Sequence, residues 1–238
     1  MNVTEALLGP LRSTAPARPL ITHYDDDAQT RVELSTATLA NWAAKTANWL
    51  VEEFDVEAGD PVCVRLPAHW QTAGVLLGAF WCGAHIVAEP AGARAVFVAA
   101  GQQLDRGPNA IVALDPMGRG LAGLREPPGS SDLDYLAEAR VAGDDFTPLG
   151  PVPDDSPALL QLSTTEVVTA AREHAASAGL GADSRVLSTV DWTLPDGLIR
   201  GLLAPLAAGA SVVQITAADP AKLEARRSAE RTTVDLLA

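Results

Sequence analysis

Several residue types are scarce in this chain of 238 residues, and each scarcity excludes a class of protein. There are two cysteines, Cys63 and Cys82, and both lie inside apolar segments, so we expect reduced, buried thiols and no disulfide framework. There are also only two lysines, Lys45 and Lys222. No uninterrupted apolar run approaches the roughly 20 residues that cross a bilayer, which excludes a transmembrane helix.

The balance of charge disfavours polyanionic partners. Acidic residues number 30 against 17 lysines and arginines, and the formal net charge is -13. Nucleic acids and anionic membranes would be repelled on average, and the N-terminus lacks the cationic and apolar stretches of a signal peptide. We therefore expect a soluble cytoplasmic protein that binds neither nucleic acid nor membrane. Histidines and cysteines with zinc-ligand spacing are absent, so we expect no metal site.

What the chain does contain is an alternation of short apolar runs with helix-like patterns. Hydrophobic residues make up 47% of the sequence, enough for a substantial core. Apolar periodicity and turn residues locate the expected elements. Strands are expected at 20–24, 30–34, 61–66, 86–88, 95–99, 110–114, 158–162, 185–189, 211–215 and 233–237, and helices at 3–12, 35–53, 70–82, 164–178, 197–207 and 220–229.

This order of elements predicts an α/β fold with mostly parallel sheets and helices on both faces. We expect a single domain over residues 1–238, and the Asp-, Gly- and Pro-rich segment 143–157 is the best candidate for a boundary between lobes 1–150 and 151–238. The Gly- and Pro-rich stretch 118–131 is expected to form turns. The three adjacent carboxylates Asp25, Asp26 and Asp27 are interpreted as a solvated turn between two strands.

Three segments carry a resemblance to a known family. Residues 56–67 (VEAGDPVCVRLP) are similar to a G-V-x-x-G-D-x-V-x-V-x-L-P stretch, and residues 76–84 (LLGAFWCGA) to the helix end that follows it. Residues 179–189 and 201–213 resemble a D-R-V-L strand and the L-x-x-G-A-x-V-V helix and strand after it. In order and spacing the chain resembles the N-terminal domain of the adenylate-forming superfamily, which includes acyl-CoA synthetases. All three segments are structural, so the resemblance implies the fold more than the activity.

The phosphate-binding loop of that family has no counterpart here. The family places a Ser/Thr/Gly-rich stretch ending in Pro-Lys-Gly directly after a strand, and the matching strand here is 157–162. Neither glycine nor lysine occurs from Pro157 to Ala178. Without glycine the backbone does not readily take the positive φ angles that aim successive N–H groups at phosphates, and without lysine no side-chain cation reaches them.

A remnant of that loop remains as Ser163, Thr164 and Thr165. Ser163 with Glu166 has the spacing of a capping box, which is the favoured interpretation. The alternative is a residual anion site, because the N-terminus of a helix binds anions and the three residues all carry hydroxyls. The three residues are therefore the candidate nucleotide-binding residues, for AMP or ATP if any cofactor is bound.

The family often carries an aromatic-histidine pair beside its acyl pocket, after the next strand. The corresponding segment here has Asp191 and Trp192 but no histidine. We take Asp191 and Trp192 as candidate substrate-binding residues. The carboxylates of Asp191 and Asp196 are interpreted as solvated, with acid-base or cation binding as the alternative.

The resemblance also implies elements that this chain does not show before Ala238. These are the adenine motif, the ribose-binding aspartate and the C-terminal lid with its catalytic lysine. We expect the fold without the lid, and no catalytic residue is assigned. The chain further resembles short actinobacterial proteins with faint similarity to AMP-binding enzymes, which the Lys-poor, Ala- and Arg-rich composition fits.

Three functions stay open at this point. The first is a degenerate, non-catalytic relative that acts as a binding or regulatory module for a nucleotide, an acyl group or a protein partner. The second is an enzyme of different chemistry on the same scaffold, although no nucleophile motif is present and the four histidines, His23, His69, His85 and His174, are isolated from one another in sequence. The third is ATP-dependent adenylation completed by a partner chain, which would still lack the glycine-lysine loop.

Overall fold

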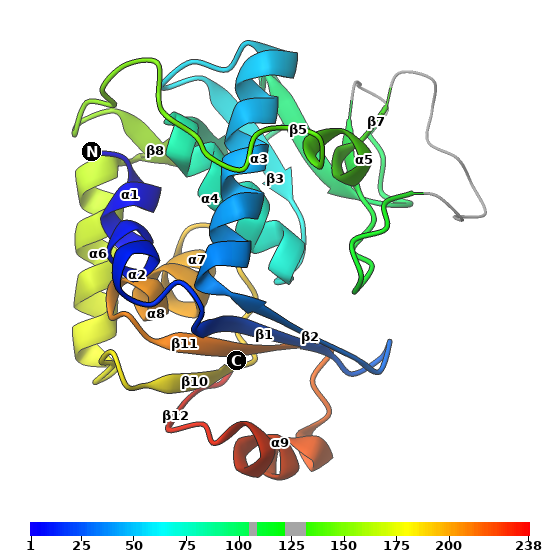
Figure 1. Cartoon of the computed structure of the whole chain (residues 1–238), viewed down its shortest axis with the longest axis vertical. Coiled ribbons are helices and arrows are strands. Elements are labelled where there is room, and N and C mark those ends of the chain that lie inside the picture. Colours follow the sequence, from blue (N-terminus) through cyan, green and yellow to red (C-terminus); the bar gives the residue numbers. More distant parts are fainter. Residues whose placement is uncertain (105–108, 122–131) are drawn as a thin grey trace.

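A computed structural model describes residues 1–104, 109–121 and 132–238. The described residues form two sheets with helices packed around and between them (Figure 1). This arrangement confirms the α/β fold expected from the sequence. The predicted turn-rich stretch 118–131 lies mostly outside the described residues. In the described part of the chain, no helix is long and apolar enough to cross a membrane.

The five-stranded sheet combines both ends of the chain. Its order is β12-β10-β11-β1-β2, and every neighbouring pair is parallel except the β1-β2 hairpin. The strands are β1 (Pro19–Asp25), β2 (Thr30–Ser35), β10 (Arg185–Ser188), β11 (Ser211–Thr216) and β12 (Val234–Leu236).

The seven-stranded sheet is built from the middle of the chain. Its order is β7-β6-β5-β3-β4-β8-β9, and only the last pair, β8-β9, is antiparallel. The strands are β3 (Pro61–Arg65), β4 (His85–Val87), β5 (Ala95–Ala99), β6 (Ala110–Val112), β7 (Leu133–Asp134), β8 (Pro157–Leu159) and β9 (Leu162–Ser163).

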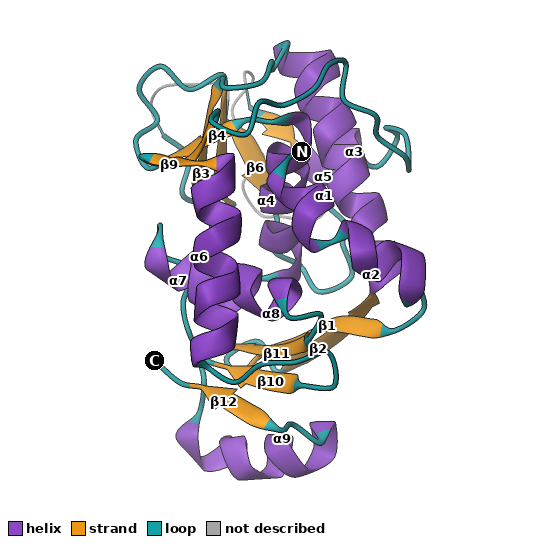
Figure 2. Cartoon of the chain, turned by 90° about the vertical axis from the view of Figure 1, so that its left-hand side faces the viewer, coloured by secondary structure: helices purple, strands orange, loops and turns teal. Residues whose placement is uncertain are grey.

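The helices connect the two sheets. In both views α6 runs from the seven-stranded sheet to the five-stranded one, and it packs against α1 and α8 (Figures 1 and 2). The helical segments are α1 (Val3–Leu7), α2 (Gly9–Thr14), α3 (Thr36–Phe54), α4 (Trp70–Cys82), α5 (Tyr135–Ala139), α6 (Thr164–Ser177), α7 (Asp196–Leu198), the π-helix η1 (Ile199–Leu203), α8 (Ala204–Ala207), the 3-10 turn η2 (Pro220–Lys222) and α9 (Leu223–Glu230).

The central helix pair α3 and α4 follows closely from local sequence signals. The side chain of Ser35 caps α3 by accepting from the amide of Thr38. Helix α4 ends at Gly83, whose φ of 84° is in the left-handed region that favours glycine. Every residue of α4 is buried. At Gly78 an added Cβ would lie 2.4 Å from the Cβ of Thr46, so glycine lets α4 pack closely on α3.

The structure corrects the expected strand at 158–162. The segment is a hairpin in which β8 and β9 are joined by Leu160 and Gln161, with Leu160 at a φ of 51°. Non-glycine residues seldom adopt this left-handed conformation. The sequence signal for a turn is therefore weak at this position, and the continuous apolar run imitates a single strand.

The expectation of a fully solvated turn at Asp25, Asp26 and Asp27 is wrong for one residue. Asp26 is buried, forms an ion pair with Arg226 and accepts a hydrogen bond from the amide of Asp219. These bonds fix the segment that leads into α9. The acidic residue at this position therefore has a structural role that local sequence does not reveal.

The suggested boundary near residue 150 does not follow the two sheets. The hairpin β1-β2 from the first part of the chain pairs with β11, and the hairpin β8-β9 from the second part pairs with β4. Each sheet therefore contains strands from both sides of the boundary. One large cluster of buried residues extends from Val3 to Leu206.

Candidate functional site

A cleft of about 610 Å³ lies where the carboxyl ends of several parallel strands converge. Its walls come from the residues that follow β3, β4, β5 and β6, and from the segment Asp191 to Leu194 after β10. The cleft thus joins the seven-stranded sheet to a loop of the five-stranded one. In open α/β sheets this edge is where ligands bind.

Trp192 forms an apolar wall of the cleft. Its side chain is buried, with a relative exposure of 5%, and it contacts the π-helix η1. A Cβ at Gly201 in η1 would lie 2.8 Å from the Cδ1 atom of Trp192, so only glycine leaves room for the indole. The glycine in this π-helical turn therefore leaves space for the tryptophan that lines the cleft.

Two side chains of strand β11 form hydrogen bonds with loops that border the cleft. The hydroxyl of Thr216 donates to the carbonyl of Ala68 at 2.6 Å, in the loop after β3. The side-chain amide of Gln214 donates to the carbonyl of Val190 at 3.1 Å, in the loop after β10. Buried hydrogen bonds of this kind restrict the loops to one arrangement. The cleft is therefore preformed rather than assembled by a ligand.

A third wall of the cleft is fixed by Gln71, on the first turn of α4. Its side chain donates to the carbonyl of Asp115 at 2.9 Å and accepts from the amide of Leu114 at 3.0 Å. Gln71 is buried, so both ends of its amide are satisfied inside the protein. The loop after β6, which contributes Leu114 to the cleft, is thereby attached to the central helix.

Beneath the cleft the fold brings together two histidines that the sequence analysis treated as isolated. The rings of His23 on β1 and His69 at the start of α4 meet edge to face, with centroids 4.4 Å apart, and both residues are buried. The Nε2–H of His23 donates to Thr216, whose own proton goes to Ala68. Nδ1 of His69 accepts from the amide of Gln71.

Burial keeps this histidine pair neutral. Desolvation lowers the pKa of His23 to about 4, although the nearby Asp25 carboxylate opposes the shift. Desolvation and the neighbouring His23 lower the pKa of His69 to about 2. Neutral imidazoles here act as hydrogen-bonding supports for the cleft loops. The pair has no short-range sequence signal, because it depends on packing β1 against the N-terminus of α4.

Charged side chains of both signs stand at the cleft. Arg65, Glu89 and Asp191 line it and are exposed, and among the described residues none of the three forms an ion pair. Cys63 lies below the loop after β4, where its thiol donates to the carbonyl of Ala88. Burial raises the pKa of the Cys63 thiol, which keeps it protonated and unreactive.

Of the residues predicted to bind ligand, Asp191 and Trp192 line the cleft, and Ser163, Thr164 and Thr165 do not. Because β9 runs antiparallel to β8 and pairs Ser163 with Pro157, it returns the chain to the amino ends of the parallel strands. The three hydroxyl residues therefore lie away from the carboxyl ends that form the cleft. The structure does not bring the two predicted groups together.

The side chains at the start of α6 are occupied by local bonds. Ser163 and Glu166 form the capping box favoured from the sequence. Thr165 donates to the carbonyl of Asp154 at 3.0 Å, and Thr164 packs against the carbonyl of Ser156. Hydrogen bonds from the capping serine lower the pKa of Glu166, which keeps a negative charge at this helix terminus.

No metal-binding cluster is apparent in the ranges that the structure covers, since no group of three or more His, Cys, Asp or Glu side chains there could hold an ion. Asp196, which the sequence analysis paired with Asp191, begins α7 and does not line the cleft. The cleft therefore offers hydrogen bonding, an apolar wall and isolated charges.

With this geometry established, comparisons with known proteins assign the fold and the family. No model of a known protein family matches the chain. A "TIGR03089 family protein" of Mycobacterium tuberculosis is 41% identical over 242 residues, which covers 98% of this chain and 97% of that protein.

Solved structures of enzymes share the fold. A Brucella canis acyl-CoA synthetase superposes with a TM-score of 0.80 at 18% identity, covering 100% of this chain and 47% of the enzyme. An anthranilate CoA ligase in complex with anthranoyl-AMP gives a TM-score of 0.69 at 14% identity, covering 90% of this chain and 45% of the ligase. The chain spans about half the length of these enzymes. It belongs to the TIGR03089 family and has the fold of the N-terminal domain of adenylate-forming enzymes.

Proposed function

We propose that this protein is a non-catalytic relative of adenylate-forming enzymes that binds a small acyl- or nucleotide-bearing molecule in the cleft. The observation that carries the proposal is the combination of a preformed cleft with the two-residue turn of Leu160 and Gln161. Because β8 ends at Leu159 and not at residue 162, this turn is the segment directly after the strand, where the resemblance places the family's phosphate-binding loop. A turn of this length has too few backbone N–H groups to surround a triphosphate. We therefore propose that the protein binds a ligand but does not catalyse phosphoryl chemistry.

The positions of both lysines support the proposal. The ammonium of Lys45 donates to the carbonyls of Arg140 and Ala142 and pairs with Asp144. Lys222 lies between Asp26 and Asp219. Neither lines the cleft, so neither replaces the missing loop lysine.

The lining of the cleft suits an acyl group joined to a polar moiety. Apolar contact is offered by Trp192, Leu66 and Leu194. The guanidinium of Arg65 is exposed and, in the part of the chain that the structure describes, forms no ion pair, so it can bind a carboxylate or a phosphate. A structure of the same fold holds anthranoyl-AMP, which combines an acyl group with a nucleotide. We therefore propose an acyl-adenylate-like ligand, or the acid or AMP portion of one.

The first experiment is a thermal-shift and calorimetry screen against AMP, MgATP, CoA and a non-hydrolysable acyl-adenylate analogue. A ligand at 100 times its Kd adds roughly 2.7 kcal/mol of stability, which a melting curve resolves readily. Arg65→Gln and Asp191→Asn should alter the affinity of a genuine ligand. Arg172→Gln is the matched control, because Arg172 is exposed on α6 and does not line the cleft.

The absence of chemistry is tested separately by pyrophosphate release from MgATP with a panel of carboxylic acids. We expect release no faster than in a protein-free control. Acid-dependent release would refute the non-catalytic part of the proposal. Equal affinities for wild type, Arg65→Gln and Arg172→Gln would instead refute the placement of the ligand in the cleft.

A further inference from the structure

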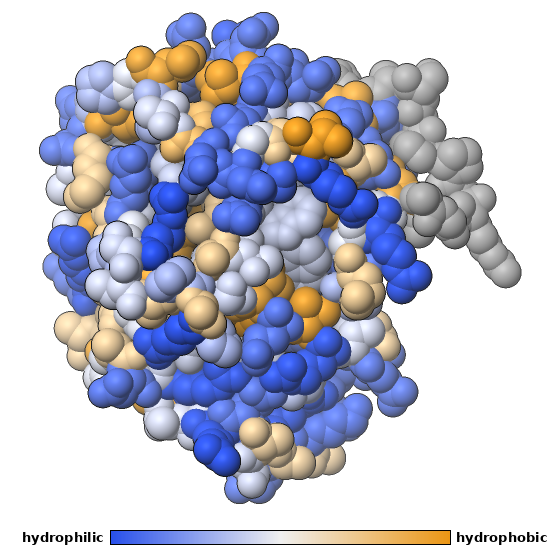
Figure 3. Space-filling model, viewed as in Figure 1, coloured by the Kyte–Doolittle hydropathy of each residue, from blue (hydrophilic) through white to orange (hydrophobic). Residues whose placement is uncertain are grey.

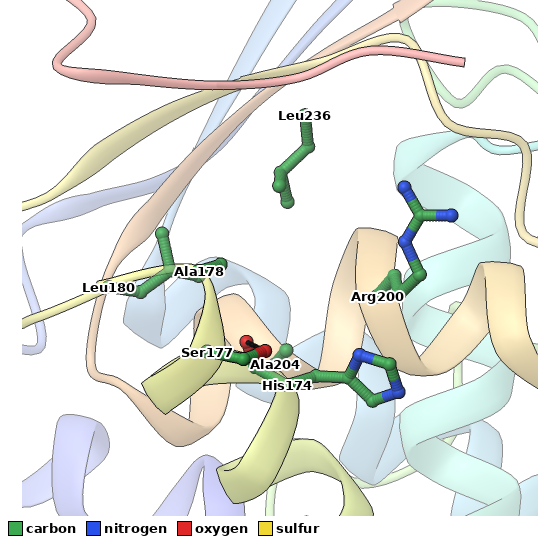
Figure 4. Close-up of a pocket in the computed structure, with 7 residues that line it drawn as sticks. All are labelled: His174, Ser177, Ala178, Leu180, Arg200, Ala204 and Leu236. Carbon is green, nitrogen blue, oxygen red and sulfur yellow. Dashed lines mark hydrogen bonds between the residues drawn. The ribbon is translucent and has the colours of Figure 1, made fainter.

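A second pocket, of about 240 Å³, lies between the carboxyl end of α6, the π-helix η1 and the strand β12. None of its lining residues lines the cleft. Figure 4 shows Arg200 and His174 together at one side, Leu236 above, and Leu180 with Ala178 on the opposite side. The pocket is therefore polar along one side and apolar along the other.

The positive charge at this pocket comes from an exposed arginine. Although the chain carries a formal net charge of -13, no carboxylate lines the pocket, and its one permanently charged lining residue is Arg200. Within the described ranges Arg200 makes neither an ion pair nor a side-chain hydrogen bond, even though Asp196 lies four residues before it. Its five N–H donors are free to bind an anion in a fork.

Two further features place Arg200 and limit what it can bind. The residue lies on η1, and π-helical turns occur mostly as local insertions that often mark functional sites. The pocket also adjoins Ser177 and Ala178 at the carboxyl end of α6, where the helix dipole carries partial negative charge. The partial negative charge repels a doubly charged anion such as phosphate more strongly than a singly charged carboxylate.

From this geometry we propose that the pocket binds a short-chain aliphatic monocarboxylate. The carboxylate pairs with Arg200 beside His174, and the alkyl chain packs on Leu180 and Leu236. At roughly 30 Å³ for an atom of the size of water, the volume admits about eight non-hydrogen atoms, the size of hexanoate. This site is separate from the cleft, and the proposal does not depend on the function proposed for the cleft.

The test uses hexanoate as the probe and hexanol as its uncharged counterpart, with the chain of 238 residues and ligand-induced NMR shifts as the readout. A ligand this small is expected to bind with a Kd of about 1 mM. We expect Arg200→Gln to weaken hexanoate binding at least 10-fold and to leave hexanol unaffected. Arg172→Gln on α6 is the matched control and should bind hexanoate as wild type does.

A second variant keeps the test independent of any defect in Arg200→Gln. Leu180→Ser should weaken hexanoate and hexanol alike, because it removes part of the apolar side that both probes share. The proposal is overturned if hexanoate fails to bind at 10 times the expected Kd. It is also overturned if hexanol binds as tightly as hexanoate, or if Arg200→Gln and Arg172→Gln bind hexanoate equally.

Discussion

At the scale of single residues, the support beneath the cleft depends on neutral imidazoles. His23 and His69 contact each other in a buried site, and the hydrogen bond from His23 to Thr216 continues to the Ala68 carbonyl at the cleft. Protonating either ring would place a charge in the core beside a second imidazole. The cleft therefore depends on the protonation state of residues that do not line it.

The histidine pair leads to a prediction on pH. The pKa of His23 falls from about 6.5 in the unfolded chain to about 4 in the folded protein, so the unfolded state binds the proton first as the pH is lowered. Stability is fully present above pH 6.5 and should fall by about 3 kcal/mol as the pH approaches 4, since each pKa unit is worth about 1.4 kcal/mol.

Urea unfolding midpoints measured from pH 8 to pH 4.5 check this prediction. His23→Gln should reduce the slope of stability against pH in that window, whatever its effect on absolute stability. A wild-type stability that stays constant down to pH 4.5 would contradict the burial argument.

At the scale of elements, the contact between α3 and α4 determines how the core is packed. A Cβ at position 78 would lie 2.4 Å from the Thr46 Cβ and 2.7 Å from the Ala43 carbonyl oxygen. The second neighbour is backbone and cannot rotate away. Gly78→Ala should therefore destabilise the protein by about 1–3 kcal/mol despite the better helix propensity of alanine.

The measurement for Gly78→Ala is the free energy of unfolding in guanidinium chloride. Gly181→Ala is the control, because nothing lies within 4 Å of an added Cβ there and the residue that follows is Ala182. The control should be neutral within about 0.5 kcal/mol. A stabilising Gly78→Ala would show that the two helices can separate without loss.

A second prediction at this scale concerns the attachment of α9 to the five-stranded sheet. Glu230 at the end of α9 pairs with Arg185 at 2.5 Å and with Arg31 at 2.9 Å, and it accepts from the Tyr24 hydroxyl. Burial opposes ionisation of Glu230, but these three donors outweigh it and lower its pKa to about 2. Its contribution is present above pH 4.5 and is lost as the pH falls towards 2.

Glu230→Gln leaves two arginines without their shared carboxylate and should cost about 2 kcal/mol at pH 7, measured by thermal and urea unfolding. Glu224→Gln removes an exposed ion pair with Arg227 from the same helix and should cost less than 1 kcal/mol. Equal losses in the two variants would mean that the buried network adds nothing beyond surface pairing.

Sequence reasoning succeeded where the signal is local. The bounds of α4 were predicted as observed, because an apolar periodic run ends at a glycine. The β8-β9 hairpin was missed because its turn places Leu160, an ordinary apolar residue, at a positive φ. In the candidate site, Asp191 and Trp192 were named as candidate substrate-binding residues and both line the cleft, while Gln71 and the histidine pair were not identified. Their roles depend on contacts between segments far apart in sequence.

At the scale of the whole molecule, polar side chains dominate the lower part of the face that carries β1, β2 and α9 (Figure 3). The ion pairs of Glu230 and Asp26 lie at the junction of these elements. The five-stranded sheet is thus secured on this side by charge, whereas α3 and α4 are secured by apolar packing.

The mixing of chain segments in both sheets predicts that residues 1–150 do not fold alone. That fragment keeps β1 and β2 without β11, and β4 without β8. It should lack the dispersed amide NMR spectrum and the near-ultraviolet circular dichroism of the full chain. Cooperative unfolding of the isolated fragment would instead establish it as an independent domain.

Strand β1 pairs with β11, as at Ile21 and Val212, so during synthesis on the ribosome β1 is made long before its partner. At a synthesis rate of about 5–20 residues per second, roughly 10–40 s pass between the synthesis of β1 and that of β11, which covers the edge of β1. During that interval β1 presents unpaired backbone groups to other nascent chains. Codon choice and chaperone access between residues 35 and 211 should therefore affect the yield of folded protein more than changes after β11.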